Sequence, residues 1–367
     1  MSEDPTSMSR LDEWLHTRRE GDPPEHRSLD LNRLLPQDSG FEAIRAELAR
    51  FIHGQEERLR QISVLLSMHL QWAKNPDPLH PPPNAVVIGP TGSGKTFTMQ
   101  VAARFLRIPF VTVDATSLVP AGIVGLQVED VLQDLVNLAD AILDESDVPR
   151  TKEDSLRLAE RGVILFDEFD KINYNSPDQG DAGLNLGVQR RLLKLCEGAP
   201  VSVGVRSHSD FVPKQSTVNT AGILILASGA FSDIGRTLAM RPAQLSLEHG
   251  PDEVLPEDLA NYGFVKELVA RFPALIQYSE LSADDLVKIL RNENISPLTV
   301  WRNYVRSLGT ELSISRDAES HFAQKASELG LGARGLQQVL FPRISKLIAD
   351  RLTSDGEGDI QVTAADL

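Results

Sequence analysis

The chain has 367 residues, which is long enough for two domains that each bury a core of their own. With 41% hydrophobic residues and a net charge of −15, its composition is that of an ordinary globular protein and disfavours nucleic acids and anionic membranes, both polyanions, as general partners. The single Cys196 excludes an internal disulfide and a cysteine-based zinc module, and no apolar run approaches the roughly 18 residues of a membrane span, so we expect a cytoplasmic protein.

The first 40 residues mix both charge signs with four prolines and are predicted to form a flexible extension without a core. Within them, Ser9 and Asp12 have the spacing of a capping box that would open a short helix. This helix is either a docking peptide for a partner or substrate, or a frayed tail that packs on its own domain.

From residue 41 to residue 279, apolar strands alternate with amphipathic helices. This order predicts an open α/β fold, with a parallel sheet flanked by helices and a nucleotide at the carboxyl ends of the strands. The predicted strands are 85–88, 110–114, 163–166 and 223–227, and helices are predicted at 97–106 and 128–143.

Residues 89–96 fit G-x-x-x-x-G-K-[ST], the pattern of a phosphate-binding loop, between a predicted strand and a helix that begins at Lys95. Glycines let successive main-chain N–H groups point at a phosphate, Lys95 adds a charge, and the Thr96 hydroxyl can bind magnesium. A chance glycine-rich turn is the alternative. The predicted nucleotide-binding residues here are Gly89, Pro90, Thr91, Gly92, Ser93, Gly94, Lys95, Thr96 and Phe97.

Two acids, Asp167 and Glu168, follow the third predicted strand directly. Asp167 would hold Mg²⁺ through its water shell, and Glu168 would polarise the attacking water. Many surface strands end in acids, but a pair downstream of a phosphate loop indicates nucleotide hydrolysis. The sequence therefore predicts ATP and Mg²⁺ as cofactors.

From about residue 280 the pattern changes to helices, which predicts a small, mostly helical lid domain over 280–367. Its expected helices are 284–290, 298–308, 318–329 and one that follows Gly335, with a last strand at 359–362. Pro342 lies inside the fourth helix and should kink or restart it.

With these elements placed, the chain resembles the ClpX and HslU unfoldases of the AAA+ superfamily over residues 48–367. Residues 52–55 resemble the segment that contacts adenine, which implies that Ile52 and His53 bind the base. Residues 89–96 and 166–172 are similar to the Walker A and Walker B motifs. Residues 223–231 resemble the sensor-1 strand, most closely that of HslU, which implies a catalytic role for Ser228.

Two arginines take catalytic roles from the same resemblance. Residues 262–273 resemble the arginine-finger helix and place the finger at Arg271, while residues 332–336 match the sensor-2 motif and place that arginine at Arg334. An arginine that reaches a neighbour's nucleotide implies a closed homo-oligomeric ring, expected to be hexameric. Without the resemblance, Arg271 would be a surface charge and Arg334 a helix-end salt bridge.

The departures from the family bear on what the ring does. The first pore loop carries Ile123 and Val124 where the family has an aromatic residue followed by an apolar one. The loss of the aromatic face predicts a weaker grip on a peptide. The second pore-loop region, 200–212, is predicted to be a solvated polar loop in which His208 is no metal ligand. Residues 232–254 contain no Ile-Gly-Phe tripeptide, and the amino-terminal zinc module is missing, so partnership with a ClpP-type peptidase is doubtful.

The leading hypothesis is an ATP-hydrolysing hexameric ring that unfolds, translocates or remodels protein substrates. The alternative is an ATP-gated assembly scaffold that recruits a partner through its first 40 residues without threading a peptide. A DNA-handling ATPase is disfavoured by the net charge of −15.

Overall fold

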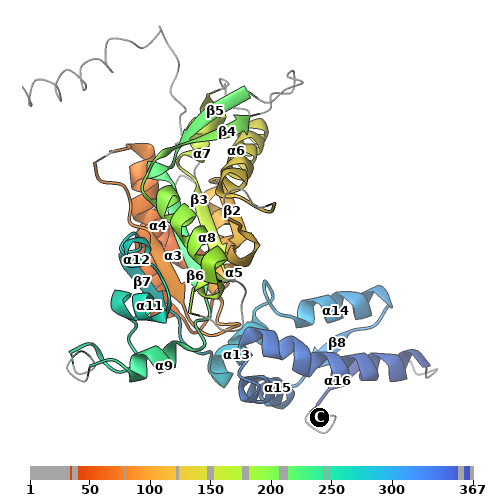
Figure 1. Ribbon diagram of the computed structural model, residues 1–367. Helices are drawn as coiled ribbons and strands as arrows, with labels where there is room; N and C mark the ends of the chain where they lie inside the picture. Colours follow the sequence, from red (N-terminus) through yellow and green to blue (C-terminus); the bar gives the residue numbers. More distant parts are fainter. Residues whose placement is uncertain are drawn as a thin grey trace, which may run out of the picture.

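The structure is a computed structural model that describes residues 34, 40–77, 79–120, 124–146, 153–175, 182–205, 214–242, 245, 248–353 and 359–363. Its buried apolar side chains form two clusters, one contributed by residues 34–278 and the other by residues 281–362. We call the two parts of the chain the large unit and the small unit (Figure 1). These two cores support a domain boundary at residue 279, which remains a proposal. The helix predicted to open at Ser9 lies outside the described residues.

The large unit is built on a parallel sheet with the strand order β2-β3-β6-β1-β7. Its strands are β1 (Ala85–Ile88), β2 (Phe110–Asp114), β3 (Val163–Asp167), β6 (Leu224–Gly229) and β7 (Ala274–Gln277). All residues of β1 and β6 are buried, which explains their unbroken apolar sequences. The predicted parallel α/β fold is confirmed. Strand β7 was not predicted, because it is a short, mostly half-buried edge strand that directly follows Pro273.

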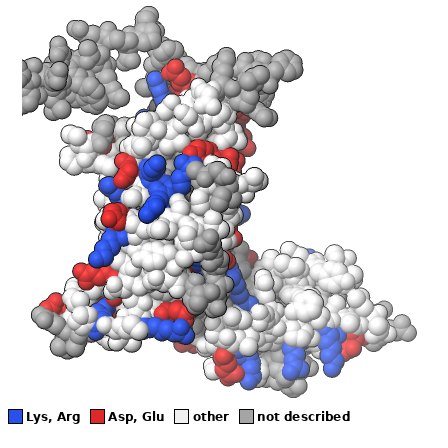
Figure 2. Space-filling model, in the orientation of Figure 1, with Lys and Arg blue, Asp and Glu red and all other residues white. Residues whose placement is uncertain are grey.

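Helices cover this sheet and include both predicted ones. Those described are α3 (Phe41–Ala49), α4 (Glu56–Lys74), α5 (Lys95–Leu106), α6 (Val128–Glu145), α7 (Asp154–Ala159), α8 (Ala182–Cys196), α9 (Ile234–Ala239), α11 (Pro256–Tyr262) and α12 (Lys266–Val269). Helix α4 packs against β7 and α6 against β2, the two edge strands. Both signs of charge are interspersed on the face of the molecule shown in Figure 2.

The prediction of a polar loop at 200–212 is wrong for its first part. Strand β4 (Pro200–Val205) pairs antiparallel with β5 (Lys214–Asn219), and the hairpin lies at the end of the large unit that is remote from the small unit (Figure 1). Val203 and Val218 are buried, so alternate residues face the core. The alternation of valines in residues 201–205 is the signal that predicts this strand. His208 lies outside the described residues.

The small unit is mostly helical, as predicted. It contains α13 (Ala283–Arg291), α14 (Leu298–Ser307), β8 (Leu312–Ile314), α15 (Arg316–Glu328), α16 (Ala333–Thr353) and β9 (Ile360–Val362). Helix α16 does not restart at Pro342, because Leu336, Leu340 and Ile344 on either side of the proline pack into the same core. None of the helices in the described ranges has the length and apolar character that a membrane span needs.

The last residues of the large unit are fastened to the sheet and to α5. The Tyr278 N–H donates to the Ile88 carbonyl at 2.7 Å, and its hydroxyl donates to Thr98 Oγ1 at 3.0 Å. The Gln55 side chain then brackets Ser279: Nε2 donates to the Ser279 carbonyl at 2.7 Å, and Oε1 accepts from its N–H at 3.2 Å. The path of the chain into the small unit is therefore fixed as far as residue 279.

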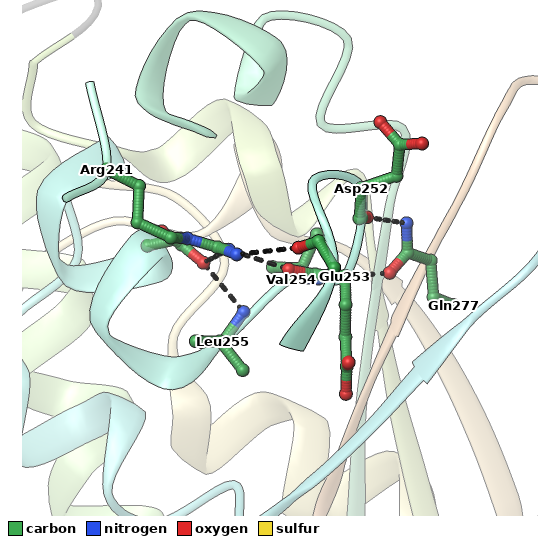
Figure 3. A network of polar contacts seen from close by, with 8 residues as sticks. Arg241, Asp252, Glu253, Val254, Leu255 and Gln277 are labelled. Atoms are coloured by element: carbon green, nitrogen blue, oxygen red, sulfur yellow. Dashed lines mark hydrogen bonds and ion pairs between the residues drawn. The ribbon is translucent and has the colours of Figure 1, made fainter. Parts of the chain in front are cut away.

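A buried ion pair holds together the two ends of the segment between α9 and α11 (Figure 3). The Arg241 guanidinium contacts the Asp258 carboxylate, and the two side chains are only 3% and 4% exposed. Arg241 also donates to the carbonyl oxygens of Gly250 at 3.3 Å and Glu253 at 2.6 Å. The Gln277 side chain binds main-chain groups of the same segment (Figure 3), which joins the segment to the end of β7.

We expect Arg241→Met to lower the free energy of unfolding of the large unit by about 3–5 kcal/mol, because Asp258 would remain as an unpaired buried charge. Urea-induced unfolding at pH 7.5 measures this change. The control is Arg236→Met, which removes an exposed pair with Asp233 (side chains 84% and 70% exposed) and should change stability by less than about 1 kcal/mol. Equal losses in the two variants would contradict the prediction.

Candidate functional site

A cavity of about 550 Å³ lies at the carboxyl ends of β1 and β3, where the two units meet. This volume is typical of small-molecule sites. Most of the predicted nucleotide-site residues line the cavity: Ile52, His53, Thr91, Gly92, Ser93, Gly94, Lys95, Thr96, Phe97, Asp167, Glu168 and Arg334. Gly89 and Pro90 come before the lining part of the loop. The small unit adds Leu281, Ile289, Asn294, Ile295, Pro297, Ala333 and Gln337, which the sequence did not indicate.

The phosphate loop has the backbone that the sequence predicts. Gly94 has a φ of 97° and is followed directly by the first turn of α5. The N–H groups of this turn have no partner within the helix and are available to bind an anion. Gly92 has a φ of 75°, and a Cβ there would lie 2.1 Å from the Leu331 carbonyl oxygen. Only glycine allows the loop to approach the small unit this closely.

Lys95 is a buried cation, 8% exposed, without an anionic partner among the described residues. Its ammonium group donates to the carbonyl oxygens of Gly89 at 2.6 Å and Pro90 at 2.8 Å. Burial lowers its pKa, while the charges of Asp167 and Asp170 act in the opposite direction. A buried ammonium group beside a helix N-terminus fits an anionic ligand such as a phosphate.

The two predicted metal ligands lie in contact. Thr96 Oγ1, in the first turn of α5, donates to Asp167 Oδ2 at the end of β3 with a distance of 2.7 Å. Hydroxyl and carboxylate oxygens are the ligands that Mg²⁺ prefers, and the ion commonly completes its shell with water and substrate phosphates. The pair therefore fits magnesium beside the phosphate loop.

Glu168 adopts a strained backbone conformation at the cavity. It is exposed and has φ 53° and ψ 32°, in the left-handed region that a non-glycine residue rarely adopts. Its N–H donates to Asp167 Oδ1 at 3.0 Å, and a short 3-10 helix (η2, Phe169–Ile172) follows it. The turn keeps Glu168 in the lining instead of continuing the strand.

Asp170 is a buried acid, 3% exposed, to which the sequence reasoning gave no role. Its Oδ1 accepts from the Ala230 N–H and its Oδ2 from the Phe231 N–H, both at 3.2 Å. A Cβ at Gly229 would lie 2.5 Å from Asp170 Oδ1. Asp170 thus joins the turn that carries Glu168 to the end of β6. The sequence signal that could have identified Asp170 is that it is the third acidic residue within the four residues 167–170.

Ser228 and Val124 do not line the cavity. Ser228 is buried beside Val87 of β1, and its hydroxyl has no hydrogen-bond partner among the described residues. The next residues, Gly229 and Ala230, reach the lining instead. Val124 is fully exposed, and Ile123 lies outside the described residues.

The two predicted arginines take different places. Arg334 lies in the first turn of α16 and lines the cavity, and the neighbouring Ala333 N–H donates to the Gly92 carbonyl at 3.0 Å. Arg271 does not line the cavity of its own chain. It lies between α12 and β7, half-exposed, with its guanidinium 3.6 Å from Glu197.

Comparison with known proteins agrees with this geometry. The family model described as AAA domain (Cdc48 subfamily) matches residues 80–275, which span the phosphate loop and the acid pair. The chain is also 30% identical over 331 residues to the ATP-dependent Clp protease ATP-binding subunit ClpX of Treponema denticola, covering 83% of this chain and 74% of that protein. The resemblance inferred from the motifs is confirmed. The chain therefore belongs to the AAA domain (Cdc48 subfamily) family and is a ClpX-like AAA+ ATPase.

Proposed function

We propose that the chain works as an ATP-hydrolysing hexameric ring motor that unfolds, translocates or remodels protein substrates. One observation carries the proposal: the cavity gathers the phosphate loop, the acid pair and Arg334, but not Arg271. A second copy that supplies Arg271 would complete the site, and repetition of that contact closes a ring. A protein substrate is supported by the Treponema denticola relative, the ATP-binding subunit of an ATP-dependent protease.

In this proposal each residue of the cavity has one task. Lys95 exchanges its two carbonyl partners for phosphate oxygens, and Thr96 and Asp167 hold Mg²⁺, which when bound neutralises charge on the phosphates. Glu168 orients and polarises the attacking water. Ser228, buried beside the strand that leads into the loop, acts at the sensor-1 position.

The hydrogen bond between Ala333 and Gly92 connects the phosphate loop to the small unit, so that ATP hydrolysis can move this unit. Because the phosphate loop is hydrogen-bonded to the start of α16, a change at the phosphates acts directly on the small unit. Arg334, in the same turn, would bind the phosphates in one nucleotide state and release them in another, which changes the angle between the units.

We also propose that the protein acts in the cytoplasm without a ClpP-type peptidase. Residues 232–254 contain no Ile-Gly-Phe tripeptide, and the part of this segment next to α11 is held down by the Arg241–Asp258 ion pair. The part of the segment that this ion pair holds is not free to reach out and dock on another ring.

The scaffold hypothesis is separated from the motor by Ile123→Asp. A motor that threads peptide should keep its ATP hydrolysis but lose unfolding of the client that co-purifies with the Glu168→Gln protein in ATP, because a charge replaces the apolar contact in the pore. A scaffold, which does not unfold the client, should keep both its ATP hydrolysis and its binding of the client. Met240→Asp, at a residue that is 84% exposed outside the pore loop, is the control and should behave as wild type.

A further inference from the structure

A cluster of hydrogen bonds joins the two units beside the cavity, through residues that lie outside the phosphate loop. Asn292, which caps the carboxyl end of α13, donates from Nδ2 to the Arg50 carbonyl at 2.7 Å, and the same atom lies 2.9 Å from His53 Nε2. Its Oδ1 accepts from the main-chain N–H of Asn294 at 3.1 Å and from its side-chain amide at 3.2 Å. We call Arg50, His53, Asn292 and Asn294 the latch.

Main-chain groups fix the direction of every hydrogen bond in the latch. The N–H of Asn294 can only donate, so the Asn292 atom that faces it is the oxygen. The carbonyl of Arg50 can only accept, so the other atom is the amide nitrogen. That nitrogen therefore also donates to His53, which is assigned as neutral, with its proton on Nδ1 and an accepting Nε2.

The surroundings of His53 favour this neutral form. Burial lowers its pKa below the ordinary value, and the nearby charge of Lys288 on α13 lowers it further. The carboxylates of Asp285 on α13 and Glu56 on α4 act in the opposite direction without reversing the shift. A protonated His53 would present an N–H to the Asn292 amide, so the latch is formed above this pKa and is lost as the pH falls through it.

The latch lies where a nucleobase would contact both units. Ile52 and His53 line the cavity from the large unit, and Ile289, Ile295 and Pro297 line it from the small unit. A ligand held between two bodies binds in proportion to the fraction of molecules in which both walls are in place. A contact that holds the walls together therefore raises the affinity for the ligand.

We propose that the latch couples nucleotide binding to pH: neutral His53 holds the small unit over the base, and its protonation opens the latch and weakens binding. Asn292 is a positioning residue in this role and touches no phosphate. The proposal rests on the nucleotide site of the proposed function but requires neither hydrolysis nor a ring. By reciprocity, a bound nucleotide opposes protonation of His53.

The test is the dissociation constant of Mg-ADP, measured by titration calorimetry with the full chain at pH 7.8 and pH 5.5, because the lowered pKa of His53 requires an acidic arm well below the ordinary histidine value. Because the phosphates of ADP also titrate near pH 6, the quantity compared is the ratio of the two constants in wild type and in His53→Gln. Glutamine offers a carbonyl oxygen to Asn292 but does not titrate in this range. Wild type should lose about 2- to 10-fold more affinity between the two pH values than His53→Gln, the range for one hydrogen bond.

A second variant, Asn292→Asp, gives a more specific test of the latch than His53→Gln. Aspartate still accepts from Asn294, but its second oxygen cannot donate to the Arg50 carbonyl at either pH and pairs with His53 only when the histidine is protonated. The loss at Arg50 is common to both pH values, so this variant should bind Mg-ADP better at the lower pH relative to the higher one, opposite to wild type. His80→Gln is the control, because His80 pairs with Asp77 on the surface, and it should keep the wild-type ratio.

Equal ratios in wild type and His53→Gln, or the absence of a reversal in Asn292→Asp, would overturn the latch and leave the nucleotide site intact. If wild type failed to bind Mg-ADP at either pH, the proposed nucleotide site would be wrong and the latch with it.

Discussion

Glu168→Gln is expected to stop ATP turnover while ATP still binds. The change removes the carboxylate that would polarise the attacking water, and general-base catalysis contributes about 10²- to 10⁴-fold to rates. Within the described residues the Glu168 carboxylate forms no hydrogen bond or ion pair, and glutamine has the same length, so the strained turn should persist. Phosphate release at saturating ATP measures the loss, and equilibrium titration should give an ATP affinity within a few-fold of wild type.

The control for this experiment is Glu57→Gln on α4, which removes a carboxylate from an exposed pair with Arg60. Its turnover should equal that of wild type. If Glu168→Gln kept more than about a tenth of the wild-type rate, the water would be activated by another group, and the role proposed for Glu168 would be wrong.

Arg271→Ala should reduce turnover by about 10³- to 10⁵-fold, the range for an arginine supplied from outside a nucleotide site. ATP affinity should change by only a few-fold, because Arg271 does not line the cavity of its own chain. The control is Glu197→Ala, which breaks the same exposed ion pair from the other side and should keep its activity.

Mixing Arg271→Ala with Glu168→Gln tests the direction of this effect. Each protein should be inactive alone. In a mixed ring, a cavity with an intact Glu168 can receive Arg271 from its neighbour, so phosphate release should recover as the two are combined. No recovery at any mixing ratio would exclude action across subunits.

The parts of the fold that the sequence predicted are those with a local signal. Strands β1, β3 and β6 are buried on both faces of the sheet, so their apolar runs were unmistakable. Strand β7 is held by its pairing with β1, which lies almost 190 residues away in the chain, and no local pattern reports such a pairing. Strand β4 did carry an alternating pattern, but the assignment of residues 200–212 to the second pore-loop region favoured the interpretation as a loop.

In the candidate site, too, some parts have a local sequence signal and others depend on contacts between distant residues. The spacing of residues 89–96 and the acid pair at residues 167–168 indicated a shared site, and residues of both motifs line one cavity. The contact between Asp170 and the end of β6 joins residues about 60 positions apart, and that between His53 and Asn292 joins residues 239 apart. Neither follows from spacing. The catalytic roles of Glu168, Arg271, Arg334 and Ser228 remain predictions for the experiments above.

The fastening of the chain as far as Ser279 also determines how the small unit could turn. Because Tyr278 and Ser279 are pinned to β1, α5 and Gln55, any rotation must have its pivot in the few residues between Ser279 and α13, close to the cavity. Helix α16 starts at the cavity and extends away from it for 21 residues, or about 30 Å at 1.5 Å per residue (Figure 1). A rotation of about 10° about this pivot would move the far end of a helix this long by about 5 Å, which is close to the length of one helical turn. A change of about one ångström at a phosphate would thereby produce a much larger displacement at the end of α16.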